Sequence, residues 1–249
     1  MPGAALGQAP ATMAAAVPAL DIRGLHAWYG ESHVLHGIDL HVQHGEVVTL
    51  LGRNGAGRTT TLRAIMGLTG PRSGSIRING VEAIRTPAHR VAHLGVGYCP
   101  EERGIFASLS CEENLLLPPR VSDSGGMSVE EILTMFPNLR ERAHSPGTRL
   151  SGGEQQMLAV GRILRTGARI LLLDEISEGL APVIVNKLAQ MVIALRQRGF
   201  TIVMVEQNFR FAAPLADRFY VLEHGTVVES FAAAQLPERA DRLGELLGV

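Results

Sequence analysis

The sequence predicts an α/β fold with a mostly parallel sheet, an antiparallel β subdomain and a helical insertion. Two apolar runs, at 47–51 and 168–175, have the length of buried strands, and each is followed by a helical pattern. Short alternating segments around the first run indicate antiparallel strands joined by tight turns. Between 101 and 166 helix-start signals replace strand signals, which places the insertion in the middle of the chain.

The composition describes one large folded domain of 249 residues, long enough for a sizeable core. A net charge of −1 gives no general reason to expect nucleic-acid binding, which usually needs a basic excess. Cys99 and Cys111 lack metal-ligand spacing and are interpreted as reduced thiols of a cytosolic protein. No apolar run approaches the roughly 18 residues of a membrane span. Residues 1–18 are expected to be a flexible tail, and 19–249 the folded domain.

The first hundred residues are expected to form strands around two short helices. Alternation from Leu20 to Val48 predicts strands that turn at Tyr29-Gly30 and His44-Gly45, with Trp28 on the core side. The next expected elements are a strand at 47–51, a helix at 59–68, a hairpin at 74–84 around Asn79-Gly80, a short helix at 87–94 and a strand at 95–99.

The insertion, at about 101–166, is expected to be a helical subdomain. Ser110 with Glu113, and Ser128 with Glu131, match the capping box, in which each side chain satisfies a backbone N–H group at a helix start. The elements expected after the insertion are a strand at 168–175, a helix at 182–198 ended by Gly199, a strand at 200–206, a hairpin at 218–230 and a short final helix.

A glycine-rich loop follows the first buried strand and opens a helix. It consists of Gly52, Arg53, Asn54, Gly55, Ala56, Gly57, Arg58, Thr59 and Thr60. The loop fits the pattern G-x-x-x-x-G-K-[ST], except that Arg58 stands in the place of lysine. Its glycines let successive backbone N–H groups point at a polyphosphate, and the helix N-terminus adds partial positive charge. The loop therefore predicts binding of a nucleoside triphosphate, with the Thr59 hydroxyl directed to Mg²⁺.

Two carboxylates, Asp174 and Glu175, end the second apolar strand. Ligands of a doubly wound sheet sit at the carboxyl ends of its strands, so both side chains are expected beside the phosphates. Asp174 would hold Mg²⁺, directly or through water, and Glu175 would polarise the attacking water. The alternative is a strand that runs into an acidic loop without a catalytic role.

A second helix start lies at Ser151, about 94 residues after the first. Ser151 and Glu154 form a capping box, so an ordinary N-cap is one interpretation. Gly152 and Gly153 leave the backbone N–H groups approachable, which favours a second anion site at this helix.

The segment LSGGEQQ at 150–156 is similar to the signature motif of ATP-binding-cassette (ABC) ATPases, and ILLLDE at 170–175 resembles their Walker B strand. The resemblance spans about residues 20–231. It implies the ABC ATPase fold with ATP and Mg²⁺ as cofactors, and a head-to-tail dimer. In that dimer Ser151, Gly152 and Gly153 would contact the γ-phosphate bound by the partner's phosphate loop.

The same resemblance implies roles for three further residues. Tyr29 falls where the family places an aromatic that stacks on adenine, the alternative being a core tyrosine. Glu101 replaces a glutamine and would ligate Mg²⁺ or its water. Gln207 replaces a histidine and would hydrogen-bond near the γ-phosphate without becoming cationic. The alternative for Glu101 and Gln207 is a polar loop residue without a catalytic role.

Glu101, Gln207 and the segment SEGLAP at 177–182 resemble the ABC branch that imports branched-chain amino acids and related small amides. Ile176 departs from that branch, which generally has proline there, and EERGIF at 101–106 is rearranged from its usual basic pair. Arg58 does not follow from the branch either. Because arginine keeps the charge of lysine but spreads it over a bulkier fork, we expect ATP binding to be retained and hydrolysis to be slow.

The leading hypothesis is therefore the ATPase subunit of an ABC importer for branched-chain amino acids or a similar solute. Its expected partners are a second cassette, identical or related, and transmembrane permease subunits that dock on 101–166, with a solute-binding protein acting indirectly and no nucleic acid. The expected location is peripheral, on the cytoplasmic face of the inner (plasma) membrane.

Two alternatives belong to other classes. A nucleotide-dependent clamp that barely hydrolyses ATP and pairs with an active cassette is favoured by Arg58, Glu101 and Gln207, and opposed by the intact Asp174-Glu175 pair. A soluble ABC ATPase acting on DNA or ribosomes is disfavoured by the near-neutral charge and by the lack of a second cassette.

Overall fold

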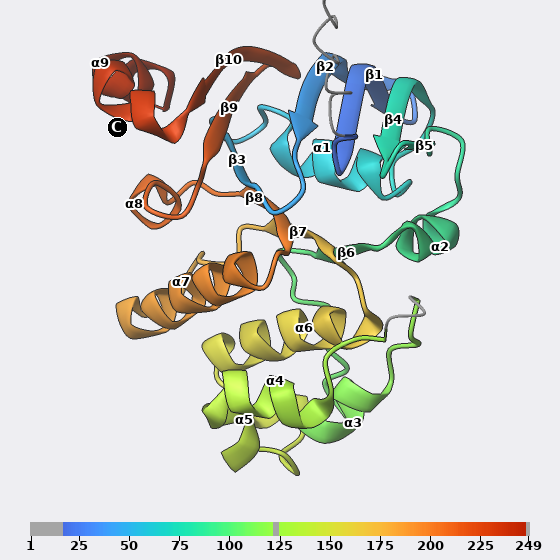
Figure 1. Ribbon diagram of the computed structural model, residues 1–249, viewed down its shortest axis with the longest axis vertical. Coiled ribbons are helices and arrows are strands. Elements are labelled where there is room, and N and C mark those ends of the chain that lie inside the picture. The colour runs from blue at the N-terminus through green and yellow to red at the C-terminus, as the bar shows by residue number, and fades with distance from the viewer. Residues whose placement is uncertain (1–16, 122–124, 248–249) are drawn as a thin grey trace, which may run out of the picture.

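The computed structural model describes residues 17–121 and 125–247, so most of the tail expected at 1–18 lies outside the described residues. Two sheets form the upper half of the view in Figure 1. The four-stranded antiparallel sheet has the order β2 (Ser32–Val42), β1 (Leu20–Tyr29), β4 (Arg72–Ile78), β5 (Val81–Glu82). The six-stranded sheet has the order β10 (Thr226–Ala232), β9 (Arg218–Glu223), β3 (Val47–Leu51), β8 (Thr201–Val205), β7 (Ile170–Asp174), β6 (Val96–Cys99). All its neighbours pair in parallel except β9 and β10.

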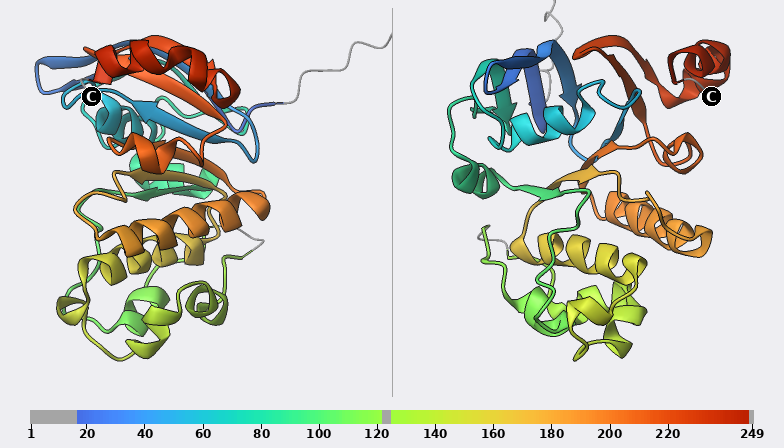
Figure 2. Two further views of the ribbon diagram at one scale, coloured as in Figure 1. Left: turned by 90° about the vertical axis from the view of Figure 1, so that its left-hand side faces the viewer. Right: turned by 180° about the vertical axis from the view of Figure 1, so that it is seen from behind.

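The helices lie on both sides of the six-stranded sheet (Figures 1 and 2). They are α1 (Arg58–Ile65), α2 (Ala88–Val91), α3 (Cys111–Leu116), α4 (Val129–Met135), α5 (Pro137–Glu141), α6 (Gly152–Thr166), α7 (Pro182–Gln197), α8 (Phe209–Ala212) and α9 (Leu236–Leu247). Short 3-10 turns occupy Ala92–Leu94, Gly147–Arg149 and Ala233–Gln235.

Alternate side chains of the parallel strands enter two different cores. In β7, Leu171 and Leu173 pack with the side chains of α6 and α7, whereas Ile170 and Leu172 pack with α1 and the antiparallel sheet. A parallel strand covered on both faces needs this unbroken apolar sequence. The sheet is therefore the middle layer, with α1 and the antiparallel sheet on one side and the helical half on the other (Figure 1).

The helical half contains α3 to α6, as the helix-start signals predict. Both expected capping boxes are confirmed: the Ser110 and Ser128 hydroxyls accept hydrogen bonds from the backbone N–H groups of Glu113 and Glu131, at 3.2 and 3.1 Å. These caps fix the starts of α3 and α4, so the chain folds back onto α6.

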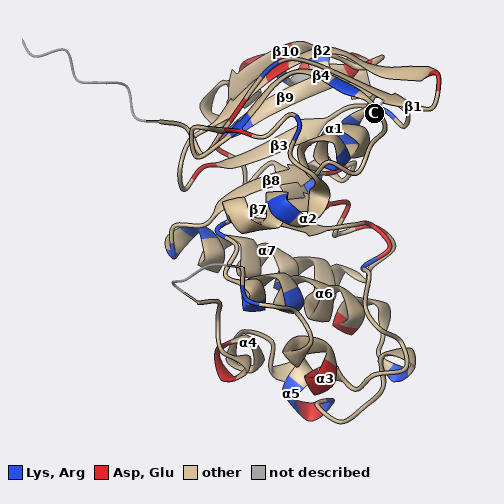
Figure 3. Cartoon of the chain, turned by 90° about the vertical axis from the view of Figure 1, so that its right-hand side faces the viewer, with Lys and Arg blue, Asp and Glu red and all other residues tan. Residues whose placement is uncertain are grey.

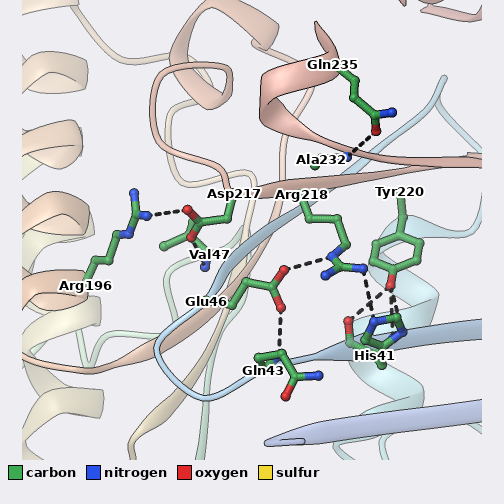
Figure 4. Close-up of polar contacts among 10 residues, drawn as sticks. All are labelled: His41, Gln43, Glu46, Val47, Arg196, Asp217, Arg218, Tyr220, Ala232 and Gln235. Carbon is green, nitrogen blue, oxygen red and sulfur yellow. Dashed lines mark hydrogen bonds and ion pairs between the residues drawn. The ribbon is translucent and has the colours of Figure 1, made fainter.

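The start of β3 is tied to the start of β9. Asp217 accepts a hydrogen bond from the Val47 backbone N–H at 2.9 Å and pairs with Arg196 of α7, and Arg218 pairs with Glu46 at 2.8 Å (Figure 4). The Tyr220 hydroxyl accepts from the His41 backbone N–H at 3.1 Å, which joins the two sheets. These contacts position the strand that leads into the glycine-rich loop.

Two expectations were wrong in detail. The helix expected at 59–68 ends at Ile65, because Gly67 takes a left-handed φ of 73° and the Leu68 N–H bonds back to the Arg63 carbonyl at 2.8 Å. Trp28 is only partly buried and stacks on His33, with ring centroids 4.3 Å apart. The register shift of β1 near Leu25 reverses the alternation, so Ala27 takes the core side.

Basic and acidic residues are interspersed along the chain. In the view of Figure 3, Lys and Arg lie beside Asp and Glu over both halves of the molecule. Within the described residues, none of the helices combines the length and the apolar character needed to cross a membrane.

Substitution of Gly225 tests how much the last hairpin stabilises the first strands. Its φ is +75° and an added Cβ would lie 2.0 Å from the Val34 carbonyl oxygen. We expect Gly225→Ala to lower the free energy of unfolding by about 3 kcal/mol, as strain and overlap add. Gly45→Ala is the matched control, because Gly45 has a φ of +76° and nothing within 4 Å of the added Cβ; its cost should be about 1 kcal/mol. Equal losses in urea unfolding would contradict the overlap.

Candidate functional site

A cleft of about 340 Å³ opens at the carboxyl ends of the central strands. The glycine-rich loop enters it from β3, Glu175 from the end of β7 and Gln207 from the end of β8. Its lining residues are Val34, Asn54, Gly55, Ala56, Gly57, Arg58, Thr59, Thr60, Glu101, Glu175, Glu178 and Gln207. The parallel topology thus gathers residues as far apart in the sequence as Asn54 and Gln207, as the strand-end argument predicts.

The loop has a shape that its glycines permit. Gly52, Gly55 and Gly57 have φ values of 151°, 82° and 101°. An added Cβ at Gly52 would lie 2.4 Å from the Leu222 carbonyl oxygen, so the loop also packs closely against β9. Helix α1 begins at Arg58 directly after the loop, and its first turn contains no acidic residue. The helix N-terminus therefore presents its free N–H groups and partial positive charge to the cleft.

Arg58 is held inside the cleft by three acceptors. Its guanidinium donates to Glu175 Oε1 at 2.9 Å, to the Glu206 carbonyl oxygen at 3.1 Å and to Asn54 Oδ1 at 3.3 Å. The Arg58 and Glu175 side chains are 5% and 7% exposed, so water screens their ion pair little. In this structure the loop cation neutralises a carboxylate of the protein itself.

Glu175 accepts hydrogen bonds on both of its carboxylate oxygens. Besides Arg58, the Gln207 amide donates to Glu175 Oε2 at 2.9 Å and to Oε1 at 3.2 Å. Glu175 also has a positive φ of 47°, a conformation that non-glycine residues adopt at an energetic cost. A strained residue whose carboxylate accepts three hydrogen bonds is held firmly in one orientation.

Asp174 lies beside the loop and is completely buried. Thr59 Oγ1 donates to Asp174 Oδ1 and the Tyr98 hydroxyl donates to Asp174 Oδ2, both at 2.9 Å. Burial raises the pKa of Asp174, and these two hydrogen bonds act in the opposite direction by stabilising the carboxylate. Neighbouring strands β6 and β7 bring Tyr98 to this place.

The oxygen atoms of Thr59, Asp174 and Glu101 suit Mg²⁺. A hydroxyl and a carboxylate stand 2.9 Å apart at Thr59 and Asp174, and Glu101 lines the same cleft. Mg²⁺ prefers such oxygen ligands and usually binds through one or two of them plus substrate phosphates. In the described part of the chain, no group of three or more His, Cys, Asp or Glu side chains is arranged as a complete metal site. The donor set therefore fits a metal that arrives with a nucleotide.

Two further carboxylates surround Glu175, and the sequence reasoning missed both. A hydrogen bond with Glu175 and partial burial raise the pKa of Glu178 to about 7. Burial is the main cause that raises the pKa of Glu206 to about 7, although the Ser177 hydroxyl and N–H both donate to it, at 2.7 and 3.2 Å. The position of Glu206 at the end of the strand beside β7 was the available signal.

Some of the predicted site residues do not line the cleft: Tyr29, Gly52, Arg53, Ser151, Gly152, Gly153 and Asp174. Tyr29 is 38% exposed, and its ring centroid lies 5.9 Å from the Arg63 guanidinium. Arg53 points away from the cleft and donates to the Glu245 and Leu246 carbonyl oxygens of α9. Ser151, Gly152 and Gly153 lie at the start of α6, which packs on the helical side of the sheet, opposite α1 (Figure 1).

The start of α6 is built as a firm N-cap. The Glu154 backbone N–H donates to Ser151 Oγ at 3.3 Å, and the Ser151 N–H donates to the Glu154 carboxylate at 2.7 Å. Arg103, in the loop that carries Glu101, donates to Gln155 Oε1 at 2.7 Å. Ser151 itself remains exposed. This helix start is therefore connected to the cleft through the 101–103 loop, but it does not reach the cleft of its own chain.

Comparisons with known proteins all point to the ABC transporter family. Residues 35–178 match the family model described as ABC transporter. The chain is 41% identical over 211 residues to the high-affinity branched-chain amino acid transport ATP-binding protein BraG of Pseudomonas aeruginosa, covering 84% of this chain and 91% of that protein. It is 32% identical over 214 residues to the lipopolysaccharide export system ATP-binding protein LptB of Acidithiobacillus ferridurans, covering 84% and 88%. A solved ATP-binding subunit of an ABC transporter superposes with a TM-score of 0.78 at 26% identity, covering 92% of this chain and 99% of that one.

Glu206 makes stability depend on pH. The pKa of Glu206 is about 7 in the folded protein, above the ordinary value of 4.5. The contribution of Glu206 to the free energy of unfolding is therefore fully present below about pH 4.5 and is lost as pH rises through 7. We expect the Glu206→Gln variant to lack this loss. Its free energy of unfolding, relative to that of the wild type, should therefore rise by about 3 kcal/mol when the pH is raised from 5 to 8.5. Urea unfolding at both pH values checks this. Parallel pH profiles for the variant and the wild type would contradict it.

Proposed function

The chain belongs to the family of ATP-binding subunits of ABC transporters, and from that premise we propose that it powers the import of branched-chain amino acids or a related small solute. The greater identity to BraG, 41% against 32% for LptB, supports import of an amino acid over lipopolysaccharide export. The residues Glu101, Gln207 and SEGLAP at 177–182 support the same branch.

We assign the nucleotide phosphates to the backbone N–H groups of 52–60 and to the N-terminus of α1. Thr59, Asp174 and Glu101 would hold Mg²⁺, which supplies charge neutralisation to the phosphates when it is bound. Glu175 would orient and polarise the attacking water, and Gln207 would hold Glu175 through the amide contact already present. Tyr29 would stack on adenine from the end of β1.

A second subunit would complete the site. Ser151, Gly152 and Gly153 form an approachable helix N-terminus that does not reach the cleft of its own chain, which supports a role toward the nucleotide of a partner cassette, identical or related. Permease subunits would dock on the helical half, where Phe106, Leu116 and Leu117 are 49%, 56% and 49% exposed. A solute-binding protein would act through the permease, and the assembly would sit on the cytoplasmic face of the inner (plasma) membrane.

The observation that carries our proposal of slow hydrolysis is the buried pair of Arg58 and Glu175. For the reaction, Arg58 must move to the phosphates and Glu175 must accept a water molecule in place of the guanidinium. Separating a buried ion pair costs several kcal/mol unless both charges find new partners, and the nucleotide offers one only to Arg58. We propose that ATP binding releases this contact and that its residual strength slows the chemical step.

Substitution of Arg58 by lysine should accelerate hydrolysis. The compact ammonium reaches phosphate oxygens as a point charge and cannot form the same planar contact with Glu175. We expect Arg58→Lys to raise kcat by about tenfold, a change of about 1.4 kcal/mol in the barrier, in the assembled transporter. Arg77→Lys, on exposed β4, is the matched control and should leave kcat unchanged. Equal rates for Arg58→Lys and the wild type would refute the slow-hydrolysis proposal.

The Glu175→Gln variant distinguishes a cassette that hydrolyses ATP from a clamp that only binds it. If Glu175 polarises water, the variant should lose hydrolysis by at least about 100-fold while nucleotide binding is retained. The Arg58–Glu175 contact also favours the second candidate, a cassette that binds ATP, barely hydrolyses it and regulates an active partner. Phosphate release by the reconstituted transporter, compared between wild type and variant, decides between them. A wild-type rate no higher than that of Glu175→Gln would favour the clamp.

A further inference from the structure

The last forty residues hold the glycine-rich loop from two sides. In the turn between β9 and β10, the Gly225 N–H donates to the Ala56 carbonyl oxygen at 3.0 Å. On the other side, Arg53 Nε donates to the Leu246 carbonyl oxygen at 3.2 Å and its NH2 group donates to the Glu245 carbonyl oxygen at 3.0 Å. The two anchors at positions 53 and 56 bracket Asn54 and Gly55, which line the cleft.

Arg53 is suited to bind the C-terminal end of a helix. The last carbonyl groups of α9 have no partner within the helix and carry its partial negative charge, so a cation that donates two hydrogen bonds stabilises them. Arg53 does not line the cleft. Its side chain therefore acts on the loop through α9, and the contact exists only while α9 is docked.

Docking of α9 depends on contacts away from the loop. Glu229 of β10, with a side chain 9% exposed, pairs with Arg239 and with Arg242, the latter at 3.1 Å. Leu243 is buried in a small core with Phe219, Phe231 and Leu51. Leu51 is the last residue of β3, directly before the loop. The same helix thus contacts the strand that feeds the loop and the loop itself.

We propose that Arg53 is a positioning residue that couples docking of α9 to the phosphate-binding loop, so that release of α9 weakens nucleotide binding. A loop anchored at both ends has little conformational entropy left to lose when a ligand orders it. A loop freed at Arg53 loses that entropy upon binding, and affinity falls. A partner that displaces α9 would therefore control the loading of the site. The proposal rests on the nucleotide site assigned above.

The test uses the full chain and MgADP, which avoids turnover. Titration calorimetry gives the affinity, and hydrogen exchange reports separately on 52–57 and on α9. We expect Arg53→Ala to weaken MgADP binding by about three- to tenfold and to speed exchange in both segments, since two charge-assisted hydrogen bonds are lost. Arg53→Lys, which still donates to helix carbonyls, should restore most of the protection and affinity.

Glu229→Gln distinguishes coupling from simple electrostatics. Removal of a negative charge should strengthen binding of a phosphate ligand if charge alone mattered, whereas loosening of α9 should weaken it by about threefold. In the double variant, Glu229→Gln should weaken MgADP binding little beyond the effect of Arg53→Ala, because both substitutions disrupt the same coupled contacts. Glu130→Gln, which breaks an exposed ion pair with Arg140 in the helical half, is the matched control and should leave affinity unchanged.

Additive effects of Arg53→Ala and Glu229→Gln, or tighter binding by Glu229→Gln, would overturn the coupling. Unchanged exchange of 52–57 in Arg53→Ala would overturn it as well. If the wild type bound no MgADP, the nucleotide site would fail, but the exchange measurements would still decide whether α9 and the loop are coupled.

Discussion

The ion pair between Arg58 and Glu175 organises the candidate site. Among the residues that line the cleft, Glu101, Glu175 and Glu178 are acidic and Arg58 is the single cation. Glu206, whose backbone carbonyl accepts from Arg58, adds a fourth and buried carboxylate. Without a cation at this position, burial and mutual repulsion would favour protonation of these groups or water entry. The pair also places a constraint on function, because the cation that neutralises Glu175 is the one expected to meet the phosphates.

That constraint fixes the orientation of both acidic residues. Both oxygens of Glu175 are bound, by Arg58 and by Gln207, and both oxygens of Asp174 are bound, by Thr59 and Tyr98. The two acidic residues are thus positioned by donors of the protein itself. A polyphosphate would compete for Arg58, and a metal would compete with Thr59 for Asp174. If the site works as proposed, ligand binding and activation of Glu175 would be linked through exchanges of individual hydrogen bonds.

The support of the loop extends well beyond the site. Strand β3 is fixed at its start by Asp217 and Arg218, its last residue packs under α9, and the loop itself is held by Gly225 and Arg53. All these contacts come from the C-terminal third of the chain. The phosphate loop is a local sequence pattern, but its geometry is maintained by residues almost 200 positions away.

Most elements and a set of candidate site residues could be predicted from local patterns in the sequence. Apolar runs defined β3 and β7, capping boxes defined α3, α4 and α6, and residues 52–60 with Asp174 and Glu175 were predicted to share one cleft, because parallel strands end at the same edge. Such signals are local, or follow from topology, and can be read without coordinates. Only the tertiary structure decided how side chains pair: that Arg58 turns to Glu175, that Arg53 turns away to α9, that Tyr98 and Glu206 join the site and that Trp28 leaves the core. These outcomes depend on competition among buried charges, on a register shift and on contacts between distant segments, none of which has a period or motif in the sequence.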